Sequence, residues 1–177
     1  MTEGQEGHSE RQHTNERFAV NRYFDEKWPW IEGSHLMRTQ LLDMLSDTDL
    51  AFNPGGANMS LGALCREMGE VEHSYLQSLK TLQQDWSYRN TDAGLEGSVA
   101  QLKAWFQTLN AEMKTAVEVF SDDDLRKSVD RTKGSTLPVD FQLDAYLQAV
   151  LIFFGKATIY LKMMNKPLPD QMREYIG

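Results

Sequence analysis

The segment from Ser60 to Leu82 carries the clearest alternation of apolar and polar positions in the chain. Its apolar residues are spaced three or four positions apart: Leu61, Leu64, Met68, Val71, Tyr75, Leu79 and Leu82. This spacing places them on one face of an α-helix, as in the seams of helix bundles. Ser60 is a suitable N-cap because its hydroxyl can accept a hydrogen bond from the first turn. The pattern therefore predicts a long helix with one buried face.

Three further segments show helical spacing. Residues 29 to 46 place on one face Trp30, Ser34, Met37, Leu41, Met44 and Leu45, and leave His35 well off that face. Residues 98 to 120 do the same with Val99, Leu102, Phe106, Leu109, Met113, Ala116 and Phe120. The stripe of residues 140 to 165 is Leu143, Tyr146, Leu147, Val150, Phe153, Phe154, Ala157, Leu161 and Met164. Leu151, Ile152 and Ile159 lie off this last stripe, so the last helix is apolar nearly all round and should be buried on more than one side.

The connections carry turn residues rather than strand-like alternation. Asn53-Pro54-Gly55-Gly56 marks a loop, and the polar segment 121 to 139 is long enough for a short hairpin turning at Lys133-Gly134. Pro167 and Pro169 should end the last helix, after which residues 170 to 176 form a short turn. Residues 1 to 17 contain no aliphatic residue beyond Met1 and are predicted to be a mobile polar tail. The prediction is an all-α four-helix bundle over residues 18 to 177.

Composition excludes several classes of function. The 177 residues carry a formal charge of -8, which does not suit binding to nucleic-acid phosphates. Cys65 is the one cysteine, so neither an intramolecular disulfide nor a cysteine-based zinc site is expected. No apolar stretch is long enough to span a bilayer, and the polar N-terminus shows no secretion signal. We therefore expect a cytoplasmic protein without a membrane partner.

The sequence motifs of the chain resemble those of the DinB-like (YfiT-like) helical-bundle superfamily over about residues 28 to 170. The run "TQLLDMLSDTDLAFNPGGANMSLGALCREMGEVEHSYLQSL" is similar to the family's first half, with its "LSDEDL"-type turn and "SLGELLxHLAEVExxYL" helix. The run "LDAYLQAVLIFFGKATIYLKMMNKPLP" is similar to its closing helix, "HxxxHxGQxxxYLRxLGxPxP". The resemblance implies an up-down-down-up bundle that is commonly dimeric.

The same resemblance implies chemistry that this chain departs from. Many members hold a divalent metal with one histidine on the second helix and a His-x-x-x-His pair on the fourth. Some of those are transferases or isomerases that use a low-molecular-weight thiol. Here the helix-two position falls on Glu67 and the helix-four pair on Leu151 and Gly155, and no histidine follows His73. We therefore expect no metal site and no cofactor.

Other residues offer weaker candidates. Glu70 and His73 spell the Glu-x-x-His unit of di-iron bundles, but only one copy exists and helical phase turns both toward solvent. Cys65 is expected to be an inert buried thiol. Glu67 is either a boundary glutamate paired with a nearby cation or a carboxylate at the mouth of a cleft that Gly155 makes roomy. In the first case Gly155 would serve close helix packing.

Two functions remain open at this point. The first is a small-molecule-binding or interaction module without the family's metal triad, acting as a homodimer. Leu151, Ile152 and Ile159 motivate the dimer because a single core cannot cover them. The alternative is a transferase or isomerase that uses a low-molecular-weight thiol, with an atypical metal site or no metal. The cleft candidates in either case are Glu67, Leu151 and Gly155.

Overall fold

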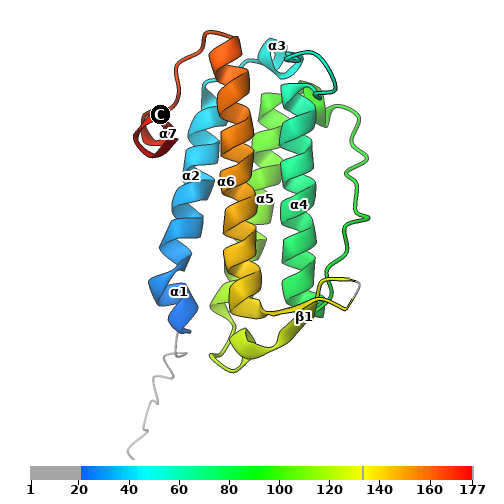
Figure 1. The fold of residues 1–177 in the computed structure, drawn as a ribbon, viewed down its shortest axis with the longest axis vertical. Coiled ribbons are helices and arrows are strands. Elements are labelled where there is room, and N and C mark those ends of the chain that lie inside the picture. The colour runs from blue at the N-terminus through cyan, green and yellow to red at the C-terminus, as the bar shows by residue number, and fades with distance from the viewer. Residues whose placement is uncertain (1–20, 133, 177) are drawn as a thin grey trace, which may run out of the picture.

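A computed structural model describes residues 21–132 and 134–176 of the chain. Its four long helices are α2 (Trp28–Asp43), α4 (Leu61–Thr81), α5 (Val99–Glu118) and α6 (Val139–Met163). Both α4 and α2 pack against α5 and α6, which closes a four-helix bundle around one core. In Figure 1, α2 and α6 run in one direction and α4 and α5 in the other. The predicted all-α class and the four predicted helices are confirmed, whereas the predicted tail lies outside the described residues.

Short elements close the ends of the bundle. They are α1 (Arg22–Glu26), α3 (Asp47–Leu50), the 3-10 turns η1 (Leu95–Gly97) and η2 (Asp124–Arg126), and α7 (Asp170–Ile176). The predicted hairpin is confirmed: β1 (Ser128–Asp130) pairs antiparallel with β2 (Thr136–Pro138), and Val129 lies opposite Leu137. None of the helices in residues 21–132 and 134–176 combines the length and the apolar character that crossing a bilayer requires.

The connection between α4 and α5, residues 82 to 94, is an extended segment that we call the strap. Because α4 and α5 run the same way, the strap must return along the length of the bundle, and Figure 1 shows it beside α4. Leu82 ends α4 in the left-handed region at φ 58°. The amide of Asp130 then donates to the Leu82 carbonyl, and the amide of Gln84 donates to the Asp130 carbonyl. These bonds fix the start of the strap to β1.

The core holds a polar cluster that the apolar pattern did not reveal. Arg38 on α2 pairs with Glu72 on α4 at 2.5 Å and donates to the Asn110 side chain at 2.6 Å. His35 lies one turn before Arg38 and is joined to the Tyr146 hydroxyl by a 2.6 Å hydrogen bond. We call these five residues the core polar cluster. Except for Asn110, which is partly buried, all are buried.

This cluster corrects the predicted face of α2. His35 was expected off the buried face, yet it is buried, while Trp30 was expected on that face and is 63% exposed. The buried face of α2 contains Trp28, Ile31, Ser34, His35, Met37, Arg38, Leu41 and Leu42. His35 and Arg38 find hydrogen-bonding partners inside the bundle, which removes most of the free-energy cost of burying them. A helical phase assigned from apolar residues alone therefore does not identify this buried face.

The end of α6 lies within two residues of the predicted one, and a backbone cap defines it. The amide of Asn165 donates to the Lys162 carbonyl and that of Lys166 to the Leu161 carbonyl. Asn165 has φ 55°. This is a Schellman cap, which satisfies the last carbonyls of the helix. The helix therefore ends before Pro167 and Pro169, and Asn165 supplies the left-handed residue that the stop requires.

Candidate functional site

Glu67 lies on the flank of α4, where it faces α6. Its side chain is 43% exposed, and Oε1 is 3.8 Å from Nζ of Lys156 on α6. Its other oxygen, Oε2, is covered by protein and finds no hydrogen-bond partner among the described residues. Tyr160 lies close by, and its pKa is raised by burial and then by the Glu67 carboxylate. Glu67 is therefore a loosely paired carboxylate beside a groove.

The structure separates the other two predicted cleft residues from Glu67. The groove between α4 and α6 has a volume of about 140 Å³, and its α6 wall is formed by Ala149, Ile152, Phe153 and Lys156. Leu151 instead lines a larger apolar groove of about 650 Å³ between α2, α6 and α7. Leu151 and Ile152 differ by about 100° around the helix, so they point into different grooves.

Gly155 does not serve close helix packing, the first of its two predicted roles. A Cβ added to Gly155 would meet nothing within 4 Å, so no helix approaches it closely. When the Tyr-Leu of the family's closing motif is aligned with Tyr160-Leu161, the motif's two histidine positions fall on Ala149 and Phe153. These are the residues that line the groove beside Glu67. The count from the sequence was therefore displaced by two residues.

A larger hollow lies on the other side of Glu67, between α4 and the strap. Its volume is about 480 Å³. Helix α4 contributes a stripe with steps of one, three and four, made of Ala63, Arg66, Glu67, Glu70, Val71 and Ser74. Met59 lines it before α4, and Trp86 and Arg89 line it from the strap. A hollow of this size is in the range of small-molecule sites.

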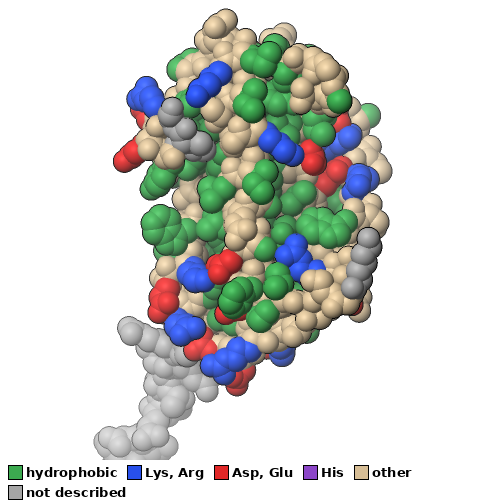
Figure 2. All heavy atoms as spheres, in the orientation of Figure 1, with side chains coloured by type: hydrophobic (Ala, Val, Ile, Leu, Met, Phe, Trp, Pro, Cys, Tyr) green, Lys and Arg blue, Asp and Glu red, His purple; other side chains and the backbone are tan. Residues whose placement is uncertain are grey.

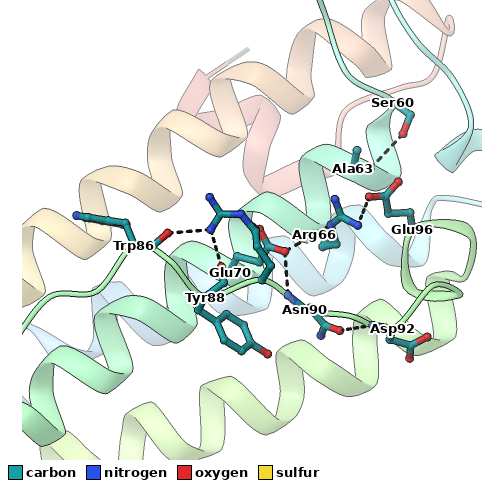
Figure 3. A network of polar contacts seen from close by, with 10 residues as sticks. Ser60, Ala63, Arg66, Glu70, Trp86, Tyr88, Asn90, Asp92 and Glu96 are labelled. Atoms are coloured by element: carbon teal, nitrogen blue, oxygen red, sulfur yellow. Dashed lines mark hydrogen bonds and ion pairs between the residues drawn. The ribbon is translucent and has the colours of Figure 1, made fainter.

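Charged side chains of both signs surround this hollow. Glu70 is nearly buried and accepts a hydrogen bond from the Asn90 amide at 3.0 Å. Its two carboxylate oxygens lie 3.5 Å from Nε of Arg66 and 3.8 Å from Nε of Arg89. Figure 3 shows Glu70 between Arg66 of its own helix and Tyr88 and Asn90 of the strap. Glu70 thus fixes the strap against α4.

The burial of Glu70 corrects the prediction that it faces solvent. The phase of α4 is as predicted, but the strap covers this flank and supplies the partners of the carboxylate. His73 is also half-buried, because its ring stacks on Tyr88 with centroids 3.7 Å apart and planes at 18°. Neither residue is arranged as a metal ligand. Residues 21–132 and 134–176 hold no group of three His, Cys, Asp or Glu side chains that could bind a metal ion.

Cys65 points into the core from the opposite side of α4. It is fully buried, and this burial raises the pKa of its thiol to about 12. The thiol is therefore protonated at neutral pH and has no access to a substrate, as expected for an inert buried cysteine.

Sequence reasoning did not find Arg66, Trp86 and Arg89 as parts of a site. Trp86 and Arg89 lie in the strap, which has no periodicity that could predict which way its side chains point. Arg66 adjoins Glu67 in the sequence, but its role depends on Glu70 and on Glu96 of η1, whose carboxylate is 2.6 Å from its Nη1. The hollow becomes visible only when α4 is paired with the strap, which returns to it from 11 or more residues further along the chain.

Comparisons with known proteins support the fold. No protein-family model and no curated protein matches the chain. A DinB-like protein of Bacillus cereus has a similar structure, with a TM-score of 0.68 and 16% identity over 82% of this chain and 93% of that one. A DinB-like protein of Bacillus subtilis, YjoA, is also similar in structure, with a TM-score of 0.61 and 15% identity over 76% of this chain and 87% of that one. The chain therefore has the fold of DinB-like proteins, which confirms the resemblance at the level of structure.

The residues at the family's metal positions do not fit a three-histidine site. Glu67 offers one carboxylate, while Ala149 and Phe153 offer no donor atom to a cation. The Lys156 ammonium, 3.8 Å from Glu67, would repel a metal ion there.

Proposed function

We propose that this chain is a DinB-like bundle that binds a polar small molecule without a metal ion, in the hollow between α4 and the strap. The observation that carries the proposal is the grouping of Arg66, Glu67, Glu70 and Arg89 around one space of about 480 Å³. Charged side chains are rarely gathered around a concave surface unless they have partners there. Trp86, Val71 and Met59 add apolar surface to the same walls.

The position of the hollow favours binding over a purely structural role. Its inner wall is a regular helix, and its outer wall is the strap. Two hydrogen bonds hold the strap to α4: the Asn90 amide donates to the Glu70 carboxylate, and the Ser74 hydroxyl donates to the Asp85 carbonyl. A site between two anchored segments is held in shape before the ligand arrives, which lowers the entropic cost of binding.

A screen by thermal shift and ligand-observed NMR tests this proposal. Polar fragments should raise the melting temperature, and Arg89→Gln should abolish the effect of those that bind here. Arg126→Gln is the matched control, because Arg126 is an exposed arginine whose one ion pair within residues 21–132 and 134–176 is with Asp123. If no fragment binds, or if every binder is indifferent to Arg89→Gln, the proposal fails.

Metal analysis of untagged protein separates this proposal from its alternative. We expect less than one tenth of an equivalent of zinc, nickel or iron per chain. One equivalent that disappears in Glu67→Ala would overturn the metal-free site and would favour the thiol-dependent transferase or isomerase instead.

We also propose that the chain forms a homodimer through the outer face of α6. Ile152 and Ile159 are exposed there, and Lys156 lies between them beside Glu67. Figure 2 looks onto this face and shows hydrophobic side chains gathered along it around a few charged ones. A twofold axis through such a face would place the Glu67–Lys156 pair of one copy opposite that of the other, in a self-complementary arrangement.

A further inference from the structure

We propose that the ligand of the hollow between α4 and the strap is a small zwitterion, with an ammonium and a carboxylate a few bonds apart and an apolar substituent. The inference rests on the proposed small-molecule site and adds the chemical class of its ligand. Free amino acids with apolar side chains are the simplest members of this class.

Two of the four charged groups are already paired with other charged groups of the protein. The Glu70 carboxylate is nearly buried and is shared by the Asn90 amide, Arg66 and Arg89. Arg66 also pairs with Glu96 at 2.6 Å, so its charge is balanced by two carboxylates. Arg66 and Glu70 are therefore engaged with each other and with Glu96 and Arg89, although Nε of Arg66 has no hydrogen-bond partner among the described residues, and both side chains keep their charges beside the hollow.

The other two charged groups have unused capacity, and their signs are opposite. Arg89 is 65% exposed and lies no closer than 3.8 Å to Glu70. Its hydrogen bonds to the Trp86 and Tyr88 carbonyls both use Nη1, which leaves Nη2 free to bind a carboxylate. Among the described residues, the Glu67 carboxylate has only the 3.8 Å approach of Lys156 to its Oε1, and the side chain is 43% exposed.

The spacing of these groups limits the size of the ligand. Glu67 and Glu70 are three residues apart on α4, so their Cβ atoms lie about 5–6 Å apart. The Arg89 guanidinium lies beside the Glu70 carboxylate. A ligand that reaches both Arg89 and Glu67 therefore carries its charges within one helical turn of each other. Trp86 and Val71 line the same space and can cover an apolar substituent.

Singly charged ligands fit the hollow less well. A simple anion would approach Arg89 but would meet the carboxylates of Glu67 and Glu70. A simple cation would approach Glu67 but would meet Arg66 and Lys156. A ligand with both charges can pair with Arg89 and with Glu67 at the same time, so each of its charges gains an opposite partner, which is how electrostatic complementarity selects a partner.

Calorimetry on the full-length protein tests the inference with the free L-amino acids as probes. We expect at least one apolar amino acid, such as leucine, methionine or phenylalanine, to bind. Its amide, which lacks the carboxylate, and its N-acetyl derivative, which lacks the ammonium, should each bind about 10- to 100-fold more weakly. Arg89→Gln and Glu67→Gln should weaken the amino acid similarly, while Arg126→Gln and Glu118→Gln, at exposed sites, should not.

The outcomes separate the two proposals. If other polar fragments bind in an Arg89-dependent way but no amino acid does, the zwitterion is wrong and the small-molecule site stands. The same holds if the amide and the N-acetyl derivative bind as tightly as the free amino acid. If neither amino acids nor fragments bind, both proposals fail. Circular dichroism and melting of each variant show that a loss of binding is not a loss of fold.

Discussion

At the scale of single residues, the core polar cluster is the least expected feature of this bundle. Arg38 is buried, with its guanidinium 3.8 Å from the centre of the Phe106 ring and 2.5 Å from Glu72. Burial disfavours the charge of Arg38, but Glu72 and Tyr146 outweigh this effect and raise its pKa. Such a pair links α2 to α4 with one geometry, which apolar contacts alone would not impose.

Removing one partner of this pair should be costly. We expect Glu72→Ala to lower the free energy of unfolding by about 3–5 kcal/mol, because it leaves the Arg38 charge buried without a counter-ion. Glu112→Ala is the control, since Glu112 pairs with Lys80 on the surface and should cost less than about 1 kcal/mol. Urea denaturation measures both changes, and similar losses in the two variants would contradict the assigned role of Glu72.

His35 should make the stability depend on pH. Burial, and then the charge of Arg38, lowers the pKa of His35 well below its ordinary value of 6.5. In the window between the lowered pKa and 6.5, the unfolded chain binds a proton that the folded chain does not, so stability falls as the pH falls.

Denaturation at pH 7.5 and 5.5 measures this contribution. Going from pH 7.5 to 5.5, the wild type should lose about 1 kcal/mol more than His35→Gln, which keeps a polar side chain without the titration. His35 also lies 3.8 Å from Glu72 and 2.6 Å from the Tyr146 hydroxyl, and neither contact reverses the direction. An identical pH dependence in the two proteins would be incompatible with a neutral buried His35.

At the scale of elements, the glycines of the helices show how packing decides what a sequence position means. Gly62 lies in the first turn of α4 against η1, and an added Cβ would lie 2.0 Å from the Glu96 carbonyl oxygen. Gly155 in the middle of α6 has open space around it. The two glycines look alike in the sequence, yet only the first is required by its neighbours.

The alanine variants at these positions should have opposite effects. Gly155→Ala should stabilise the protein by about 0.5–1 kcal/mol, because alanine has the higher helix propensity. Gly62→Ala should destabilise it by about 1–3 kcal/mol, because the backbone of η1 must move. Thermal and urea unfolding give both values. A gain in stability from Gly62→Ala would show that η1 does not contact α4 as described.

At the scale of the whole molecule, the exposed side of α6 should decide the oligomeric state. We expect a dimer of about twice 20.3 kDa by light scattering at micromolar concentration. Ile152→Lys should give a monomer, because Ile152 is 62% exposed and a charge there cannot be buried in an interface. Tyr175→Lys, at an exposed residue on α7, is the control. A wild-type monomer would contradict the dimer.

The chain's own pattern determined the fold class, the four long helices and the hairpin, because steps of three and four in apolar residues report directly on a helical face. It also determined that Cys65 is buried, since it lies at the inner edge of the α4 seam. The periodicity of α4 also predicted that Glu67 lies on the flank of the seam, where the structure places it beside Lys156 of α6. On α6 the apolar stripe predicted the buried face correctly, and Leu151, Ile152 and Ile159 are exposed off it. The assignment of Leu151 and Gly155 to the cleft came from counting along the family's motif, which the apolar pattern does not check.

Only the tertiary structure decided which polar residues are inside and where the charged hollow lies. His35, Arg38 and Glu72 are buried because each finds a partner on another helix, and no local pattern encodes such a partner. Arg89 and Trp86 reach α4 because two parallel helices force the strap to run back beside it. Contacts between segments distant in sequence are set by the packing of the bundle, so the candidate site emerges only once the chain has folded.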